Sequence, residues 1–330
     1  MSPLVSIVIN NYNHGRFVGE AIDSALGQAY HDVEVIVVDD GSTDNSRQVI
    51  ESRGNKVWAI FKANGGQASA MNAGFAASKG DLILFLDSDD RLEANAIETV
   101  VHEWRDGVSR MIFPLELIDG RGERLGRAIG GARMPSLMHG PVDMGSPTSG
   151  NVFSRAALEK IMPIPEEDWR ISADAYLNTA SLFGEVRCLK QPLGCYRVHG
   201  ANNSWCAEPL RLVRTRLDYD LRMYNVVFRL TGRKVGSLEN WLGACPQHWV
   251  RRIKLLRENP QDYPWPDSLP KLTFRAVKAT WRQPNRNFRR RLAYTVFAVG
   301  YAILPRKATQ AMWSVEGRGR GRGLRRLLGT

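Results

Sequence analysis

The fold is decided by one stretch, Leu82-Ile83-Leu84-Phe85-Leu86-Asp87-Ser88-Asp89-Asp90, in which apolar residues run directly into an acidic cluster. The apolar part predicts a strand buried on both faces, as in a parallel sheet. The acidic part then lies at the carboxyl end of that strand, where open α/β sheets bind their ligands. Clustered carboxylates repel one another unless a cation lies among them, and Mg²⁺ or Mn²⁺ suits such oxygen ligands. The stretch therefore predicts a metal–diphosphate site; alternatively, Asp89 or Asp90 only caps a helix that begins near Leu92.

Shorter apolar runs over residues 4–9, 33–38 and 57–61 predict three earlier strands, each followed by a polar turn and a helical pattern. This alternation indicates βαβ units with right-handed crossovers, and hence an α/β fold. Three of the strands then bring polar loops to one edge of the sheet: residues 11–13, 39–40 and 87–90. Further along, Met111 to Leu117 and Leu193 to Val198 predict two more strands, and residues 121–133, rich in Gly and Arg, predict a mobile loop.

The bulk composition is that of a globular protein, with 43% hydrophobic and 24% charged residues in a chain of 330. The four cysteines show no metal-binding spacing, which indicates reduced thiols and a cytoplasmic location. The first apolar run is too short for a signal peptide.

Charge is divided unevenly along the chain. Residues 1–206 carry 19 Lys and Arg against 26 Asp and Glu, whereas residues 207–330 carry 26 against 8. A block in which one sign dominates so strongly predicts a surface for an anionic partner.

The basic last third has a helical pattern from Leu210 onward. Its apolar segment 292–304 is too short to span a bilayer, which needs about 20 residues. With its basic flanks it predicts either peripheral contact at a membrane interface or an ordinary buried helix. Residues from about 315 form a Gly- and Arg-rich tail that we expect to be disordered. No RNA-binding motif is present, so no specific nucleic acid partner is expected.

Four motifs in this order resemble the family 2 glycosyltransferases of the GT-A fold: residues 5–13 (VSIVINNYN), 37–44 (VVDDGSTD), 64–74 (NGGQASAMNAG) and 86–90 (LDSDD). The resemblance covers roughly residues 1–205. It implies a Rossmann-like, mixed but mainly parallel sheet with helices on both faces. Residues 1–206 would form the catalytic domain, with a nucleotide-sugar half over about 1–110 and an acceptor half over about 111–206. Residues 207–330 would form a mainly helical basic region.

By this resemblance, the first two loops hold the nucleoside of a nucleotide-sugar donor. Asn11, Tyr12 and Asn13 would lie beside the base and ribose, although Tyr12 also fits a packing role at the helix entry. Asp40, with Asp39 beside it, would read the edge of the base, most often uracil in this family. An ionised carboxylate only accepts, so it suits the imide N–H. The alternative for Asp40 is a turn-forming role.

The third and fourth motifs would hold the diphosphate and the sugar. Gly66, Gln67 and Asn72 are placed among the donor-binding residues. Residues 65–67 precede a helix N-terminus, which favours an anion, although a plain flexible turn also fits. Asp87 and Ser88 would face the ribose or the donor sugar. Asp89 would bind the Mn²⁺ or Mg²⁺ ion that bridges the phosphates.

Two later segments complete the resemblance. Asp174 aligns with the family's catalytic base, although Ala173 precedes it where Glu is common, and Asp168 is the second candidate. Asp174 also fits a helix cap. Arg197 would pair with phosphate, and His199 would bind the metal or diphosphate, or be structural.

These expectations combine into an inverting, metal-dependent glycosyltransferase at the cytoplasmic face of a membrane. Its donor would be a nucleotide-diphosphate sugar, most often a UDP-sugar, and its acceptor a glycan or lipid-linked glycan. Three alternatives remain at this point: a nucleotidyltransferase on a similar sheet, a non-catalytic membrane-peripheral scaffold that retains a nucleotide pocket, and a basic nucleic-acid binder. The first would favour a Gly-rich loop with Lys and Arg after the first strand, where this chain has residues 10–13. Salt-sensitive RNA binding at the tail would favour the third.

Overall fold

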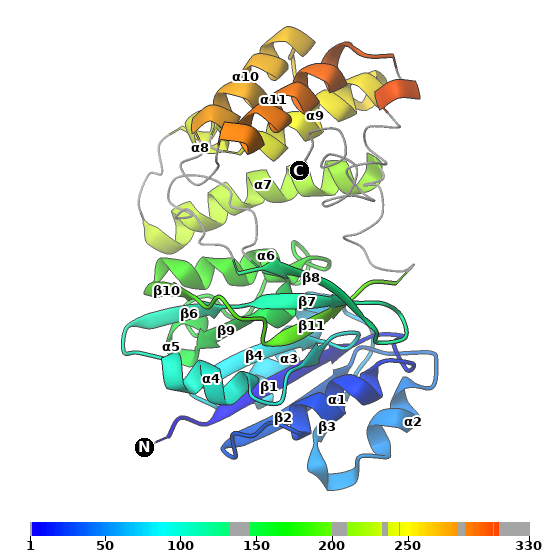
Figure 1. Ribbon diagram of the computed structural model, residues 1–330, viewed down its shortest axis with the longest axis vertical. Helices are drawn as coiled ribbons and strands as arrows, with labels where there is room; N and C mark the ends of the chain where they lie inside the picture. The colour runs from blue at the N-terminus through cyan, green and yellow to red at the C-terminus, as the bar shows by residue number, and fades with distance from the viewer. Residues whose placement is uncertain are drawn as a thin grey trace. The chain divides into compact units, whose positions relative to one another are not determined.

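The computed structural model describes residues 2–131, 146–199, 210–232, 237–243, 245–282, 288–305 and 307–309 (Figure 1). The chain divides into two compact units. Unit 1 comprises residues 1–134 and 143–199, and unit 2 comprises residues 135–142 and 200–330. The predicted domain boundary at residue 206 and the predicted disordered tail lie outside the described residues.

A seven-stranded sheet forms the centre of unit 1, in the order β10-β6-β9-β4-β1-β2-β3. The four strands expected from the first apolar runs are confirmed and are mutually parallel, and β9 runs antiparallel between β4 and β6. The sheet is therefore mixed but mainly parallel, as predicted. Its strands are β1 (Val5–Asn11), β2 (Val33–Asp39), β3 (Trp58–Phe61), β4 (Leu82–Asp87), β6 (Val108–Ile112), β9 (Asn151–Ser154) and β10 (Glu185–Cys188).

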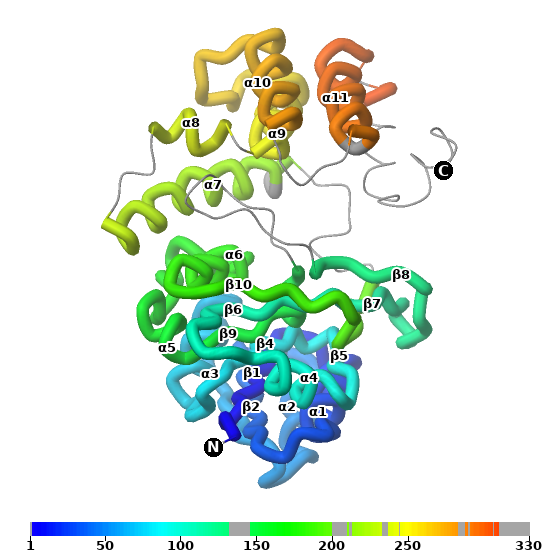
Figure 2. The backbone as a smooth tube through the Cα atoms, turned by 60° about the vertical axis from the view of Figure 1, so that its left-hand side comes forward, coloured from blue at the N-terminus to red at the C-terminus, as the bar shows by residue number. Residues whose placement is uncertain are grey.

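Helices cover both faces of this sheet. The connections through α1 (Val18–Leu26) and α2 (Ser46–Glu51) step outward from β1 to β3, and α3 (Gln67–Ala77) returns the chain past β1 to β4. Because each crossover is right-handed, the return lies on the opposite face. In Figure 2, α3 accordingly lies on one side of β1, and α1 and α2 lie on the other. The strand order thus reverses between β1 and β4, which is where an open α/β sheet binds its ligand.

A second sheet of four strands, in the order β5-β11-β7-β8, corrects two sequence-based expectations. The single strand expected over residues 111–117 is wrong. The chain breaks at Phe113, whose N–H donates to the Gly150 carbonyl, and β7 begins at Pro114, which has no N–H to donate. The mobile loop expected over 121–133 is also wrong where described, because β8 pairs along β7. The strands are β5 (Arg91–Leu92), β7 (Pro114–Ile118), β8 (Arg124–Gly130) and β11 (Gly194–Arg197).

The strand β8 was missed because its side chains are almost all exposed, so no alternation of apolar residues marks it. The rest of unit 1 is made of short helices. These are α4 (Ala96–Glu103), α5 (Arg155–Leu158) and α6 (Ala173–Leu177), with the 3₁₀ segments Gly54–Lys56, Thr148–Gly150 and Asn178–Leu182.

Unit 2 is helical in its described part, as predicted. Its interior includes the buried side chains of Trp241 and Trp249, and Val213, Leu217 and Leu255 form a buried apolar cluster. None of the described helices is long and apolar enough to cross a membrane. The helices are α7 (Leu210–Thr231), α8 (Leu238–Leu242), α9 (Pro246–Glu258), α10 (Leu269–Arg282) and α11 (Phe288–Ile303), with a 3₁₀ turn at Pro260–Asp262.

Candidate functional site

The acidic cluster lies at the point where the strand order reverses. β1 and β4 are parallel neighbours with Asn10 beside Asp87, and the amide of Asn10 donates to Asp87 Oδ1 at 3.1 Å. On the other side of β1, Asn11 lies beside Asp39. The parallel register thus brings the polar ends of β1, β2 and β4 to one edge.

Asp87 lies in a negatively charged environment within this cluster. Burial, then the negative charges of Asp89 and Asp174, raise the pKa of Asp87 to about 7, while hydrogen bonds from Asn10 and Thr148 oppose the rise. A nearby cation would stabilise the ionised form of such a carboxylate and lower its pKa. Asp174 follows Ala173, whose N–H donates to the Gln67 side chain, and the amide nitrogen of Gln67 is 3.5 Å from Asp87 Oδ1.

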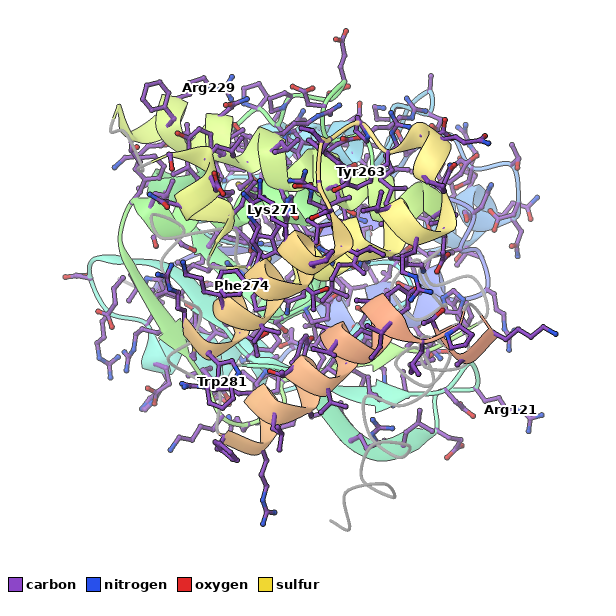
Figure 3. The ribbon with its side chains drawn as sticks, turned by 90° about the horizontal axis from the view of Figure 1, so that it is seen from above. Arg121, Arg229, Tyr263, Lys271, Phe274 and Trp281 are labelled. Carbon is purple, nitrogen blue, oxygen red and sulfur yellow. The ribbon has the colours of Figure 1, made fainter. Side chains whose placement is uncertain are left out.

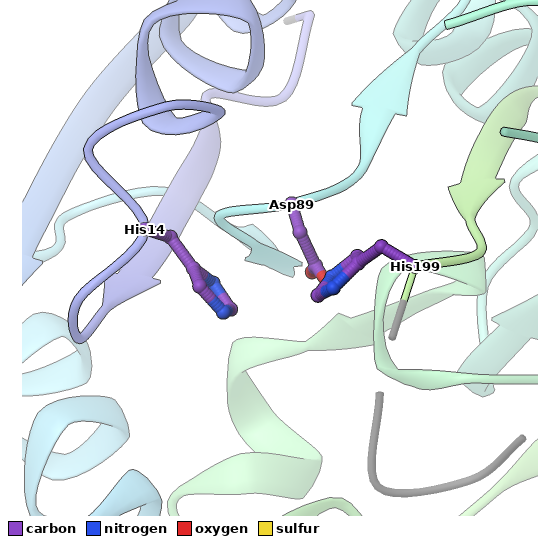
Figure 4. Close-up of side chains that lie close together, drawn as sticks. All are labelled: His14, Asp89 and His199. Atoms are coloured by element: carbon purple, nitrogen blue, oxygen red, sulfur yellow. The ribbon is translucent and has the colours of Figure 1, made fainter. Parts of the chain in front are cut away.

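Asp89 forms a cluster with two histidines, which Figure 4 shows. Asp89 Oδ2 lies 2.9 Å from His199 Nε2, and each side chain is 13% exposed. His14 joins them, and one ligand atom from each residue lies within 4.8 Å of the other two. The Nδ1 atom of His14 is 3.0 Å from the Ser88 hydroxyl, which orients the ring. These three side chains can hold a divalent cation.

The donor set contains two imidazoles and one carboxylate. Mg²⁺ prefers oxygen ligands, whereas two imidazoles with one carboxylate form a set used by first-row transition ions. The cluster is therefore compatible with a divalent transition ion. His14 was not predicted from the sequence. The available signal was its position, directly after the polar loop that ends β1 at the same edge as Asp89.

Asp90 and Arg197 are buried and support the loop that carries Asp89. Asp90 accepts from the Arg197 backbone N–H at 2.9 Å and from the Ser149 hydroxyl at 2.6 Å, so it is not a helix cap. Arg197 donates through Nε to the Asp89 carbonyl and through its terminal nitrogen to Glu20 at 2.6 Å. The Arg197 side chain, which is fully buried, thus fixes the Asp89 loop in this arrangement instead of facing a phosphate.

The loops after β1 and β2 are joined by their own hydrogen bonds. Asn11 donates to Asp39 at 3.0 Å, and the Asn13 side-chain carbonyl accepts from Thr43 N–H at 2.7 Å. Asn13 has a left-handed backbone, with φ of 56°. Tyr12, between them, is 47% exposed, so its ring is available to an incoming base.

Asp40 fixes the turn that precedes α3. It accepts from Lys62 Nζ at 2.8 Å, from Gly65 N–H at 3.0 Å and from Gly66 N–H at 2.7 Å. Four acceptor positions are available on a carboxylate, so capacity for one further donor remains. Gly66 has φ of 89°, and a Cβ there would lie 2.6 Å from the Arg170 carbonyl oxygen. This close approach requires glycine.

Two predicted donor-binding residues of α3, Gln67 and Asn72, lie in different surroundings. Gln67 lies at the cluster. Its side-chain carbonyl accepts from Ala173 N–H at 3.0 Å, and its side-chain amide nitrogen is 3.5 Å from Asp87 Oδ1. Asn72 makes its contacts elsewhere, because its amide donates to the Ile164 carbonyl and accepts from the Ile164 N–H. Asn72 therefore fixes the segment after α5.

Asp174 is the second residue of α6, and it does not occupy the N-cap position, which is Ser172. A small hollow beside it is lined by Asn151, Leu177 and Asn178. Asp168, the second candidate base, is exposed.

A buried cation lies behind this hollow. Arg110 is fully buried and donates twice to the Asn151 carbonyl, at 3.0 and 2.6 Å. Burial lowers the pKa of Arg110 to about 9, and the charge of Asp174 opposes this shift. The sequence analysis did not single out Arg110, which lies in β6, one residue before the strand expected over residues 111–117.

The sequence comparisons identify the family. The family model described as glycosyl transferase family 2 matches residues 6–161. An uncharacterized glycosyltransferase of Nostoc is 38% identical over 216 residues, which cover 62% of this chain and 67% of that protein. The chain belongs to glycosyltransferase family 2. A chondroitin synthase of Pasteurella multocida is 47% identical over 105 residues, but these cover 31% of this chain and 11% of that protein.

Solved structures support the fold. TarS of Staphylococcus aureus, residues 1–349 in complex with UDP, has a TM-score of 0.55 at 16% identity and covers 99% of this chain and 92% of its own. The mannosyltransferase PcManGT of Pyrobaculum calidifontis, in complex with GDP-Man and Mn²⁺, has a TM-score of 0.50 at 13% identity and covers 95% of this chain and 88% of its own. At these identities the likeness concerns the fold alone, and it matches the predicted GT-A class.

Proposed function

We propose that this glycosyltransferase is an inverting, Mn²⁺-dependent enzyme that uses a nucleotide-diphosphate sugar, most often a UDP-sugar. The observation that carries the proposal is the convergence of Asp87, Asp89, His14 and His199 where β1 and β4 part, with Asp174 close enough to act on Asp87. TarS is described in complex with UDP and UDP-GlcNAc, and PcManGT with GDP-Man and Mn²⁺, which supports this class of donor.

Asp89, His199 and His14 would hold the metal. A bound divalent cation supplies positive charge to the diphosphate as it leaves. His199 and Asp89 are held at hydrogen-bond distance, and Arg197 fixes the backbone of Asp89, so the site is organised before the donor binds. Pre-organisation of this kind removes the cost of assembling ligands during the reaction.

The nucleoside would lie over the loops after β1 and β2. Tyr12 offers its exposed ring to the base, and Asn11 and Asn13 fix the two loops to each other. Asp40, held by the turn before α3, retains acceptor capacity for the imide N–H of uracil. The remaining residues proposed to bind the donor are Asp39, Gly66, Gln67, Asp87 and Ser88.

Asp174 would act as the general base. Its carboxylate takes the proton from the acceptor hydroxyl while that oxygen forms the new bond to the anomeric carbon and the nucleotide diphosphate leaves from the opposite side. One displacement inverts the configuration at that carbon. The acceptor would be a glycan or a lipid-linked glycan at the cytoplasmic face of a membrane, where the anionic leaflet attracts the basic residues 207–330.

The test combines donor binding with donor turnover. UDP with Mn²⁺ should raise the melting temperature of the wild-type chain, because a ligand that binds only the folded state stabilises it. UDP alone should raise it less. Asp89→Asn should remove the metal-dependent part and reduce UDP-sugar hydrolysis by about a hundredfold or more.

The matched control is Asp23→Asn, which changes a surface carboxylate that pairs with Arg53 and lies outside the site. It should leave both readouts unchanged. Full hydrolysis by Asp89→Asn, or no stabilisation of the wild type by UDP, GDP or thymidine diphosphate with Mn²⁺, would overturn the proposal and favour the scaffold alternative.

A further inference from the structure

The outward face of α10 alternates basic and aromatic side chains. Lys271, Phe274, Lys278 and Trp281 recur at helical spacing and are all exposed, whereas Leu272, Ala276 and Ala279 on the opposite side are buried. Figure 3 shows Lys271, Phe274 and Trp281 one after another along the helix. An aromatic side chain that is 65% exposed, as Phe274 is, leaves a large apolar area in water.

Helix α11 continues this surface. Phe288, Leu292, Val296 and Ile303 are 65%, 45%, 61% and 74% exposed, and they recur at helical spacing, while Ala298 and Tyr301 are buried. The two helices meet where the rings of Trp281 and Phe288 pack edge to face, 5.7 Å apart. The Trp281 indole also donates to Thr295 at 3.1 Å, which ties the aromatic end of α10 to α11.

The charge of this region has one sign. From residue 268 to residue 315 the sequence contains ten Lys and Arg and no Asp or Glu. Lys271, Lys278, Arg282 and Arg289 are exposed beside the apolar side chains. An apolar row bordered by these cations matches one kind of surface, the interface of a membrane rich in anionic headgroups.

We propose that the exposed face of α10 and α11, the α10–α11 face, binds the surface of an anionic membrane. Phe274, Trp281, Phe288, Leu292 and Val296 enter the interface, and the four exposed basic residues bind lipid phosphates. The helices lie along the membrane, since none of the described helices is long and apolar enough to span it. The proposal rests on the membrane contact proposed above for residues 207–330 and assigns it to particular side chains, and it uses no residue of the candidate site.

Two other occupants fit the face less well. A second copy of the chain would place the exposed Lys271, Lys278, Arg282 and Arg289 of one face against cations of the other. A nucleic acid would be attracted by the charge and could stack on the exposed aromatic rings, but it would leave the aliphatic Leu292, Val296 and Ile303 in water. A lipid surface satisfies both the charge and the aliphatic row.

The experiment is co-sedimentation of the full chain with vesicles of phosphatidylcholine alone or with about a third phosphatidylglycerol. Wild type should bind the anionic vesicles and not the neutral ones. Phe274→Ser with Val296→Ser should reduce binding about tenfold or more, because two exposed apolar side chains are lost. Lys271→Gln with Lys278→Gln should reduce it by a similar factor at low salt.

The matched control is Phe228→Ser with Arg229→Gln, an exposed aromatic and basic pair on α7, and it should bind as wild type does. Circular dichroism melting verifies that every variant is folded. Equal loss in the α7 control, no binding by wild type, or variants that change the oligomeric state or RNA binding instead of vesicle binding would each overturn the proposal. UDP-induced stabilisation, measured on the same variants without vesicles, reports separately on the donor site.

Discussion

Single side chains at this site divide into those that face the ligand space and those that hold the loops. Asp89, His14 and His199 are partly exposed and converge, whereas Asp90 and Arg197 are buried and satisfied by protein atoms. The sequence motifs identified Asp89, His199 and Arg197 as site residues, but they did not indicate which side chains face the ligand and which support the loops. The distinction depends on burial and on partners such as Glu20, which are distant in the sequence.

At the residue scale, His14→Ala tests the metal cluster. Loss of one imidazole should raise the Mn²⁺ concentration needed for half-maximal UDP-sugar hydrolysis by roughly tenfold or more. A metal titration of the initial rate measures this. His102→Ala is the control, because that side chain is 79% exposed on α4 and lies outside the cluster. An unchanged titration for His14→Ala would remove His14 from the ligand set.

Asp174→Asn tests the base. The amide cannot take a proton, so kcat for transfer should fall roughly 10²- to 10⁴-fold. Stabilisation by UDP with Mn²⁺ should remain, because Asp174 is not among the proposed donor ligands. Asp168→Asn, the exposed alternative, should change kcat less than twofold. The reverse pattern would assign the base to Asp168.

At the scale of elements, the β–α alternation of the first ninety residues was predictable because buried strands are continuous apolar runs. The second sheet was predicted only in part: the run Leu193 to Val198 indicated β11, whereas the side chains of β8 are almost all exposed and its pairing comes from the edge of β7. Gly66 shows the same limit: the sequence suggests an anion-binding turn, whereas its requirement for glycine comes from the Arg170 carbonyl.

The turn before α3 gives a stability prediction. Gly66→Ala should lower the free energy of unfolding by about 3 kcal/mol, because its φ of 89° and ψ of 175° are a region used almost only by glycine. Gly54→Ala is the control: Gly54 has φ of 60° with nothing within 4 Å of a Cβ, so it should cost about 1 kcal/mol. Urea unfolding measures both. Equal costs would show that the Arg170 contact adjusts freely.

At the scale of the whole molecule, the uneven charge seen in the sequence follows the two units: unit 1 has net negative charge and unit 2 has net positive charge. The sequence left two alternatives for residues 292–304, buried or interfacial. The structure shows that α11 buries Ala298 and Tyr301 and exposes Leu292 and Val296, and membrane contact of the exposed side is the proposal made above. The sequence could not predict which side of α11 is buried, because this depends on the helices that pack against it.

The stability of the chain should fall in mild acid through unit 2. Burial lowers the pKa of His248, whose Nδ1 lies 2.8 Å from Asp220. The unfolded chain takes up this proton as the pH falls through about 6.5, whereas the folded chain does so only at a lower pH. The free energy of unfolding should therefore decrease over that interval. His248→Gln should flatten this part of the stability–pH profile, and an unchanged slope would contradict the assignment.

The position of β11 has a practical consequence for protein engineering. The family model ends at residue 161, yet α6 carries Asp174 and the chain beyond β11 carries His199. A chimera that exchanged only residues 6–161 with a relative would join one parent's Asp89 to the other parent's His199 and Arg197. A chimera that keeps the contacts of Asp89 with Arg197 and His199 within one parent therefore needs a junction after residue 199, so that both sheets come from that parent.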